Sequence, residues 1–242
     1  MKDTMRCTKC ILPSSYPGIE FDNQGLCIYC QAEMKNRDLP EGMKDKTDLD
    51  KIIRDHKRKN TKYDAIVGLS GGKDSTYQVV RMLQLGLNPL CVTSSTCDLA
   101  PLGRANIENL KRLGVDHVEM SPNPLVRAKL NRIGLTQVGD ISLPEHVGIF
   151  TIPVRAAVQF SVPLIVWGEN SQNEYGGPAA AAGNNVLNRR WLEEFGGLLG
   201  MRVSDLIGHE GLEARQLIPY TYPTDDELAS VNEVTDLLKP VL

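Results

Sequence analysis

The sequence contains no long apolar run and no excess of positive charge. No stretch approaches the ~18 consecutive apolar residues that a membrane-spanning helix needs. The N-terminal sequence MKDTMRCTKC has no apolar core of the kind that secretory signal peptides contain. These two absences predict a cytoplasmic protein with no membrane partner. The net charge of −3 disfavours a nucleic-acid partner, because proteins that grip a long nucleic acid usually carry a basic face.

Internal repeats and low-complexity tracts are also absent from the sequence. With 242 residues, of which 41% are apolar and 24% charged, the chain has the balance of a globular protein with one sizeable core and a small accessory unit. Four of the six cysteines fall in residues 1–45, and a helical pattern begins near Asp48. We therefore expect a cysteine-rich unit over residues 1–45 and a larger domain over residues 46–242.

From Tyr63 onward, short apolar runs alternate with helical stretches. The expected strands are 65–69, 89–95, 117–121 and 162–168, and the expected helices are 74–85, 103–114, 123–134, 152–161 and 189–199. Strands that alternate with helices predict an α/β fold with a parallel sheet covered on both faces. The small-residue stretch GGPAAAAGNN (176–185) is expected to form a mobile or ligand-closing loop.

The N-terminal cysteines fall into two pairs. Cys7 and Cys10 form one C-x2-C pair, Cys27 and Cys30 form a second, and sixteen residues separate the pairs. Each pair places two thiolates on a tight turn, and this spacing predicts a structural Zn²⁺ site with four sulfur ligands. Two disulfides are an alternative that a cytosolic location disfavours, and an iron–sulfur cluster is a second alternative. Because such a zinc site has no open coordination position, we expect it to be structural.

A glycine-rich loop, SGGKDS, lies between an expected strand and an expected helix. Backbone N–H groups at a helix N-terminus point at an incoming anion, and the helix dipole favours negative charge there. Two glycines permit close approach of the backbone, two serines add hydroxyl donors, a lysine adds positive charge and an aspartate can hold Mg²⁺. These residues are Ser70, Gly71, Gly72, Lys73, Asp74 and Ser75, and Thr93 after the next strand is a further candidate for the same ligand. The loop therefore predicts a site for a magnesium polyphosphate.

Two common phosphate-binding motifs do not match this loop. A Walker A loop has glycine where this sequence has Val67, and it has serine or threonine where this sequence has Asp74. The G-x-G-x-x-G pattern is also missing, which disfavours a dinucleotide site.

The SGGKDS loop after a hydrophobic strand resembles the PP-loop of the ATP pyrophosphatases. This resemblance implies a nucleotide-binding α/β domain like that of the adenine nucleotide α-hydrolases, preceded here by a small zinc-ribbon-like unit. It also implies ATP and Mg²⁺ as cofactors. Members of the superfamily cleave ATP between the α and β phosphates and adenylate a carbonyl or amide-like oxygen, and a nucleophile then displaces AMP. Lys73 and Asp74 are the implied catalytic residues of the loop.

Four polar residues crowd the stretch that follows the last expected strand: Glu169, Asn170, Asn173 and Glu174. If that strand neighbours the strand before SGGKDS, these side chains face the loop, because ligands bind beyond the carboxyl ends of parallel strands. The two glutamates are candidates for metal binding or proton transfer, and the two asparagines are candidates for substrate orientation. A polar surface loop is the alternative interpretation.

Together with CTKC and FDNQGLCIYC, this polar stretch is similar to the N-acetyl sugar amidotransferases of bacterial surface-polysaccharide (including lipopolysaccharide) and nonulosonic acid pathways. Further similar stretches are 103–116, 127–155 and 189–208. The resemblance implies conversion of an N-acetyl group on a nucleotide-linked sugar into an acetamidino group, with ammonia as the nucleophile. It also implies a separate glutaminase and a cyclase-like subunit that supply the ammonia, since this chain has no convincing nucleophilic cysteine with a companion histidine.

Members of that family usually continue well beyond the region that matches 218–228, whereas this sequence stops at Leu242. A truncated form, a short homologue and one half of a split enzyme are the alternatives that this departure raises. Homo-oligomer contacts through either domain are also left open.

Several other residues were weighed for the reaction. His146 could accept the proton that ammonia loses, although a structural role is favoured, and Asp140 could serve as a site acid or a helix cap. His209 and Glu210 have no accompanying nucleophile. A tRNA thiolase is a rival function that needs catalytic cysteines, for which Cys97 is the one well-placed candidate, whereas Cys91 is expected in the core. A non-catalytic ATP-binding partner subunit is the other rival.

Overall fold

The computed structural model divides the chain into two compact units, Met1–Asp55 and His56–Leu242. The expected boundary at residue 45 falls in a stretch that lies outside the described residues. The described residues are 5–16, 19–37, 46–57, 62–96, 98–168, 189, 193, 198, 201–231 and 235–237.

The N-terminal unit consists of two cysteine turns followed by a helix. Isolated antiparallel bridges pair Arg6 with Pro13 and Phe21 with Cys27. Helix α1 (Ile28–Arg37) begins directly after the third cysteine of the cluster. The sequence did not indicate this helix, because its apolar residues stay exposed and provide no buried stripe. Helix α2 (Lys46–Lys57) coincides with the helical pattern that begins near Asp48.

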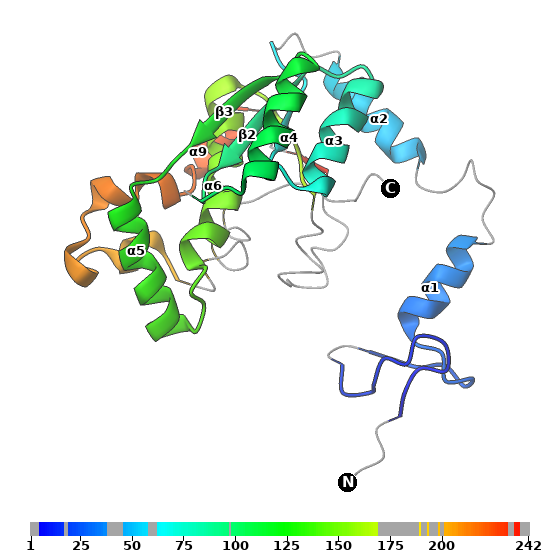
Figure 1. Ribbon diagram of the computed structural model, residues 1–242. Coiled ribbons are helices and arrows are strands. Elements are labelled where there is room, and N and C mark those ends of the chain that lie inside the picture. Colours follow the sequence, from blue (N-terminus) through cyan, green and yellow to red (C-terminus); the bar gives the residue numbers. More distant parts are fainter. Residues whose placement is uncertain are drawn as a thin grey trace. The chain divides into compact units, whose positions relative to one another are not determined.

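A five-stranded sheet forms the centre of the larger unit (Figure 1). Its strands are β1 (Ala65–Gly68), β2 (Pro89–Ser94), β3 (Asp116–Met120), β4 (Leu164–Val166) and β5 (Thr235–Leu237). The order is β3-β2-β1-β4-β5, and every neighbouring pair is parallel. The α/β fold class with a parallel sheet is therefore confirmed, and β5 is an addition that the sequence did not indicate.

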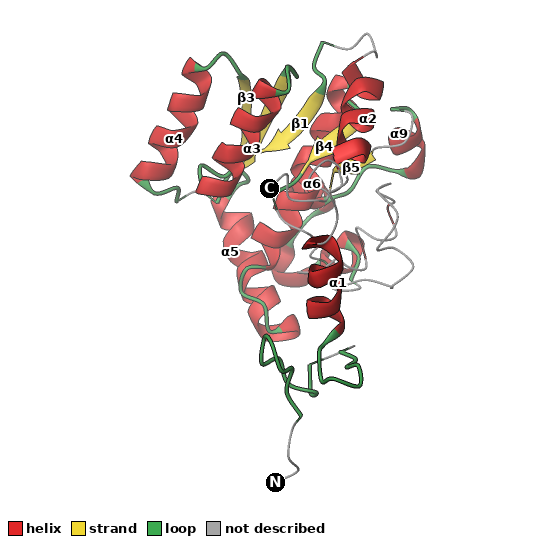
Figure 2. Ribbon diagram, turned by 90° about the vertical axis from the view of Figure 1, so that its right-hand side faces the viewer, coloured by secondary structure: helices red, strands yellow, loops and turns green. Residues whose placement is uncertain are grey.

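Helices cover both faces of this sheet. Helices α3 (Lys73–Gln84) and α4 (Pro101–Arg112) lie on one face, and α6 (Leu143–Phe160) lies on the other (Figure 2). Helix α5 (Pro124–Ile133) packs against α6 and continues into a π-helical turn, Gly134–Val138. Since both faces are covered, the first five residues of β2 are all buried. None of the described helices has the length and apolar character required to cross a membrane.

Helix α6 begins earlier than the sequence indicated. The expectation of a helix over 152–161 is corrected to Leu143–Phe160, so only its second half was anticipated. Pro153 lies inside the helix and Gly148 lies near its middle, and both residues usually argue against a helix interior. The structure explains the glycine, because a Cβ on Gly148 would lie 2.7 Å from Ser94 Oγ. Close packing of the helix on β2 has overridden the local preference.

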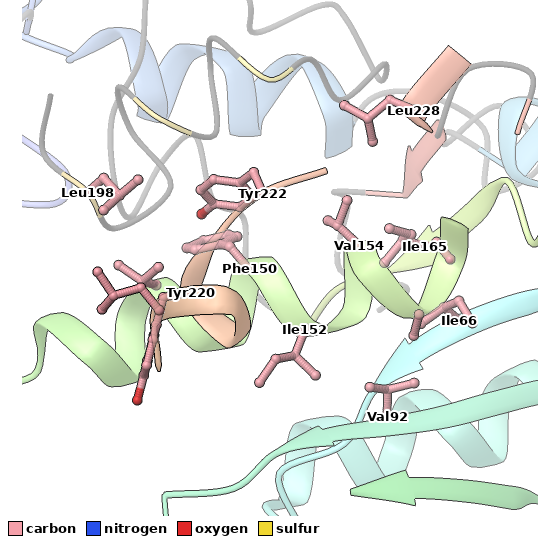
Figure 3. Packing of buried hydrophobic residues seen from close by; sticks show 14 of the residues in the cluster. Ile66, Val92, Phe150, Ile152, Val154, Ile165, Leu198, Tyr220, Tyr222 and Leu228 are labelled. Atoms are coloured by element: carbon pink, nitrogen blue, oxygen red, sulfur yellow. The ribbon is translucent and has the colours of Figure 1, made fainter. Parts of the chain in front are cut away.

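The main core forms between α6, the sheet and the C-terminal segment (Figure 3). Ile152 extends from α6 toward the strands, where Ile66 and Val92 lie, and Phe150 packs 5.3 Å from the ring centroid of Trp167. The C-terminal segment adds three 3₁₀ turns and a short helix: Val203–Leu206, His209–Gly211, Ala214–Tyr220 and α9 (Asp225–Ala229). The core thus joins segments that are distant in sequence and fixes the position of β4 beside β1.

Replacement of Phe150 by alanine tests this core. Phe150 is 2% exposed, so the Phe150→Ala variant should lose about 3–5 kcal/mol of the free energy of unfolding. The control Leu102→Ala removes a side chain that is 73% exposed and should change stability by less than about 0.5 kcal/mol. Urea unfolding followed by tryptophan fluorescence measures both, since Trp167 lies in the same core. Equal midpoints for the two variants would contradict the packing described here.

Candidate functional site

The glycine-rich loop lies at the carboxyl end of β1, where the direction of strand addition reverses. Strands β2 and β3 lie on one side of β1, and β4 and β5 lie on the other. Ligands of open parallel sheets bind at such a switch point. The expectation that the strand before Glu169 neighbours β1 is confirmed, because Ile66 pairs with Ile165 and Val67 with Val166.

Serine hydroxyls hold the loop in shape. The backbone N–H of Ser70 donates to Ser75 Oγ at 3.2 Å, and Ser75 Oγ donates to the carbonyl oxygen of Gly72 at 3.2 Å. The N–H of Gly72 donates to Ser70 Oγ at 3.3 Å. Gly72 is also the N-cap of α3, and no side chain caps this helix end. The first N–H groups of α3 are therefore left to an external acceptor.

Lys73 and Asp74 project from the first turn of α3 into solvent. Their side chains are 91% and 72% exposed, and Lys73 Nζ lies 3.2 Å from Asp74 Oδ1. An exposed pair of this kind is weak, so either side chain can turn to a ligand at little cost.

Gly71 fixes how the loop meets α4. Its φ of +75° is a conformation that favours glycine, and a Cβ at this position would lie 2.4 Å from the carbonyl oxygen of Gly103. The side chain of Asn106 donates a hydrogen bond from Nδ2 to the carbonyl oxygen of Gly71 at 2.8 Å. The sequence gave no signal for Gly103 and Asn106, because both make their contacts through tertiary packing.

Thr93 supports the loop from below. It is 4% exposed, and its hydroxyl donates to the carbonyl oxygen of Leu69, the residue before the loop. Thr93 Oγ1 also lies 2.8 Å from His117 Nε2. Because the hydroxyl proton is directed at Leu69, this nitrogen of His117 must be the donor. Burial lowers the pKa of His117, which favours the neutral ring that this hydrogen bond needs.

Gln78 connects α3 to the end of β4. It is 4% exposed, and its Nε2 donates to the carbonyl oxygen of Trp167. Since that carbonyl can only accept, the orientation of the amide is fixed, and Gln78 Oε1 is left buried with no hydrogen-bond partner. Sequence reasoning did not single out Gln78.

A cavity of about 150 Å³ opens beneath the loop. Ser70, Asp74 and Ser75 contribute polar groups to its lining. Ile149 and Pro153 contribute to the opposite wall, together with apolar residues of the strands. Since Pro153 has no N–H, the carbonyl oxygen of Ile149 lacks its usual helical donor. The cavity therefore combines apolar walls with a carbonyl acceptor.

The described residues do not include every predicted site residue. Glu169, Asn170, Asn173 and Glu174 lie outside them, as do Cys97 and the stretch 176–185. The site assignments for these residues stay predictions.

The remaining acid and base candidates form local pairs. His146 Nδ1 lies 2.8 Å from Asp140 Oδ2, and Asp140 Oδ1 accepts the N–H of Ser142 at the start of α6. Glu210 pairs with Arg132 at 2.9 Å. Within the described residues, none of these groups hydrogen-bonds to the glycine-rich loop.

Arg104 and Glu119 form a paired group beyond the ends of β2 and β3. Arg104 Nη1 and Nη2 lie 2.5 and 3.0 Å from the two carboxylate oxygens of Glu119. This hydrogen-bonded pairing, aided by Ser95, lowers the pKa of Glu119 to about 2. The carboxylate therefore stays ionised over the whole physiological range.

In the N-terminal unit, the four cysteine sulfurs form one compact cluster. The sulfurs of Cys7, Cys10, Cys27 and Cys30 all lie within 4.8 Å of one another. Sγ–Sγ distances of 3.8 Å and 3.6 Å are far longer than a disulfide bond of about 2.05 Å. They match the ~3.8 Å edge of a tetrahedron with Zn–S bonds of about 2.3 Å. The cluster can therefore hold a zinc ion, and the disulfide alternative does not fit.

Backbone groups prepare one of these thiols for metal binding. Burial opposes ionisation of Cys7, but N–H groups that include those of Lys9 and Cys27 lower its pKa to about 6. Burial and the neighbouring thiols raise the pKa of Cys30 to about 12. One thiolate is thus available at neutral pH, and bound metal would have to displace protons from the others.

Comparison with known proteins gives similarities of limited extent. No family model matches the sequence. An uncharacterized protein of Methanocaldococcus jannaschii is 31% identical over 90 residues, which cover 36% of this chain and 32% of that protein. The match thus spans about a third of the length of this curated relative.

Two solved structures share part of the arrangement. The NMN synthetase from Francisella tularensis aligns with 77% of this chain and 89% of its own, at 16% identity and a TM-score of 0.41. A predicted subunit of a tRNA methyltransferase from Methanocaldococcus jannaschii aligns with 48% of this chain and 58% of its own, at 18% identity and a TM-score of 0.32. Neither similarity is high enough to carry a functional argument.

Zinc content tests the cysteine cluster. The purified chain should contain one zinc ion, and Cys10→Ser should lose it because three sulfurs and a hydroxyl bind zinc far more weakly. The control Cys91→Ala changes a buried cysteine of β2 and should leave the zinc content unchanged. Elemental analysis after gel filtration measures both. Iron in place of zinc, or metal retained in full by Cys10→Ser, would contradict the assignment.

The Arg104–Glu119 pair makes stability depend on pH. The pKa of Glu119 is lower in the folded state, so its contribution is present above about pH 4.5 and is lost as the pH falls toward 2. Glu119→Gln should therefore lower stability by about 2–3 kcal/mol at neutral pH and by progressively less in acid. Urea unfolding at several pH values measures this difference.

The control for this prediction is Glu108→Gln, which removes an exposed carboxylate that lies 2.8 Å from Lys111. Solvent screens this pair, so the variant should stay close to the wild type at every pH. A Glu119→Gln deficit that does not shrink in acid would contradict an ionic origin.

Proposed function

We propose that the larger unit is an ATP-dependent enzyme of the PP-loop type, which forms AMP and pyrophosphate. The observation that carries this proposal is the geometry of the glycine-rich loop. An uncapped helix N-terminus lies at the switch point of the sheet, with Gly71 in a left-handed conformation and Lys73 exposed beside it. Such an arrangement is suited to the phosphates of a nucleotide.

The residues of the loop have separate roles in this proposal. The free N–H groups of α3 and the ammonium group of Lys73 bind the β and γ phosphates and stabilise the departing pyrophosphate. Asp74 is placed to hold Mg²⁺, which supplies further charge neutralisation when bound. The cavity beneath the loop offers apolar walls and the carbonyl acceptor of Ile149 to the nucleobase.

The more specific function that we propose is N-acetyl sugar amidotransfer in bacterial surface-polysaccharide or nonulosonic acid synthesis. The amide oxygen of the N-acetyl group attacks the α phosphorus, and pyrophosphate leaves. Ammonia then adds to the activated carbon, AMP departs with the original oxygen, and loss of a proton leaves the acetamidino group. This specificity is supported by the sequence resemblance of the 166–185 stretch and the cysteine pairs, and a separate glutaminase with a cyclase-like subunit would supply the ammonia.

The residues after β4 complete this proposal. Glu169 and Glu174 would bind metal or accept the proton, and Asn170 and Asn173 would orient the sugar. The adjacency of β4 and β1 supports their assignment, because the chain leaves β4 at the same edge of the sheet as the loop.

The proposed activity is tested with α-labelled ATP, Mg²⁺, ammonium chloride and a panel of nucleotide-linked N-acetyl sugars. We expect AMP and pyrophosphate to form only with one sugar and ammonium, and that sugar to lose about 1 Da as =NH replaces =O. Lys73→Met should reduce AMP formation by at least about 100-fold, as should Glu169→Gln. The matched control Lys111→Met removes an exposed lysine of α4 that pairs with Glu108, and it should keep full activity.

Other outcomes identify the rivals. AMP formation that depends on tRNA and not on any sugar would replace this function with that of a thiolase. ATP binding without cleavage, even with ammonium and every sugar, would indicate a non-catalytic partner subunit. Equal rates for wild type and Lys73→Met would refute the assignment of the loop.

A further inference from the structure

A second, larger cavity lies beyond the carboxyl ends of β2 and β3. Its volume is about 800 Å³, which is within the range of sites for small molecules. Its polar lining residues come from the two strand ends and from the starts of α4 and α5: Ser95, Asp98, Arg104, Glu119, Ser121 and Asn123.

The charges in this cavity nearly cancel. Arg104 and Glu119 are bound to each other through both guanidinium nitrogens and both carboxylate oxygens. Asp98 is the one other charged residue in the lining, so the cavity carries about one negative charge. No cation remains unpaired within the lining to hold a phosphate or a carboxylate. A neutral ligand is therefore favoured over an anion.

The uncharged groups match a ring that carries several hydroxyls. Asn123 Oδ1 already accepts the N–H of Leu125 at 2.9 Å, so its amide NH₂ is the part left for a ligand. Arg104 also has N–H groups beyond the two that bind Glu119, and Ser121 offers an exposed hydroxyl. Leu99 and Leu125 add apolar surface, and Leu125 is 75% exposed. Donors and acceptors beside an apolar wall are what the hydroxyls and C–H groups of a sugar ring require.

This cavity adjoins the glycine-rich loop at two places. Ser94 lines the cavity beneath the loop, and its neighbour Ser95 lines the larger one. On α4, Gly103 lies against Gly71 of the loop, and the next residue, Arg104, lines the larger cavity. The two cavities therefore share one strand end and one helix.

We propose that the larger cavity binds a neutral, polyhydroxylated ring, the sugar of the acceptor substrate, through the Arg104–Glu119 pair and Ser121. The role of this ring as acceptor rests on the proposed ATP-dependent function, whereas its binding does not. The ribose of a nucleoside shares the same hydroxyl chemistry, so the test must separate the two sources.

The test uses the full chain without ATP or Mg²⁺ and measures binding by titration calorimetry and ligand-observed NMR. N-acetylglucosamine is the neutral sugar probe, adenosine is the ribose-bearing probe, and inorganic phosphate is the anionic probe. We expect the sugar to bind and the other two to bind at least about 10-fold more weakly. Ser121→Trp fills the cavity while it keeps the ion pair, and it should weaken sugar binding at least about 10-fold.

A pair of variants on one helix provides the matched comparison. Arg104→Gln should weaken sugar binding as Ser121→Trp does, whereas Arg112→Gln should bind like the wild type. Arg112 lies on the same helix but bonds Asn109 at 3.1 Å and does not line the cavity. Thermal unfolding of each variant verifies that the fold is retained, and Ser121→Trp decides the matter if Arg104→Gln does not fold.

Three results would overturn the proposal: no sugar binding by the wild type, equal binding by Ser121→Trp, or displacement of the sugar by adenosine or phosphate at lower concentrations. The proposed function fails separately. Sugar binding without any AMP formation would leave the cavity assigned and remove the enzyme function. AMP formation with a different acceptor, without sugar binding, would do the reverse.

Discussion

The contact between Gly71 and Gly103 is the constraint on which the candidate site depends. The left-handed conformation of Gly71 turns the chain from β1 toward α3, and its missing side chain lets the loop touch the backbone of α4. Asn106 then binds the carbonyl oxygen of Gly71. A side chain at position 71 would collide with backbone, which cannot move aside as a flexible side chain can. The loop, the N-terminus of α3 and the start of α4 are therefore held as one arrangement.

A second set of contacts holds the floor of the site. Thr93 binds the carbonyl oxygen of Leu69 and is itself supported by His117, while Gln78 binds the carbonyl oxygen of Trp167 at the end of β4. The loop is thus connected to β2 on one side and to β4 on the other. The buried, unpartnered Oε1 of Gln78 costs about 1–3 kcal/mol, a cost that the fold tolerates at the switch point. Such local costs are typical of places where a fold serves function as well as stability.

The sequence was sufficient for the alternation of strands and helices and for the loop, because these depend on local pattern. Strands β1 to β4 and helices α3 to α5 lie close to their expected ranges. Local pattern failed for the first half of α6, where Gly148 and Pro153 are accepted because the helix packs closely on β2. It also failed for α1, whose apolar residues are exposed, and for β5, a strand of three residues.

Within the site, the same distinction separates what could be predicted from what could not. The glycines, the lysine and the four cysteines are recognisable by spacing, since a tight turn or a metal demands those residue types. Asn106, His117 and Gln78 are ordinary polar residues of helices and a strand, and only the assembled sheet brings them to the loop. Arg104 and Glu119 are fifteen positions apart, and no sequence pattern pairs them.

The alternation of side chains along β2 explains how one strand end can serve two cavities. Ser94 points to the face covered by α6, as its closeness to Gly148 indicates, and it lines the cavity beneath the loop. Ser95 follows on the opposite side and lines the cavity with Arg104 and Glu119. A charged ligand at the loop and a neutral ring in the larger cavity would therefore meet across the carboxyl end of β2. Group transfer between them requires no large movement of the sheet, because the two sites are separated by the width of a single strand.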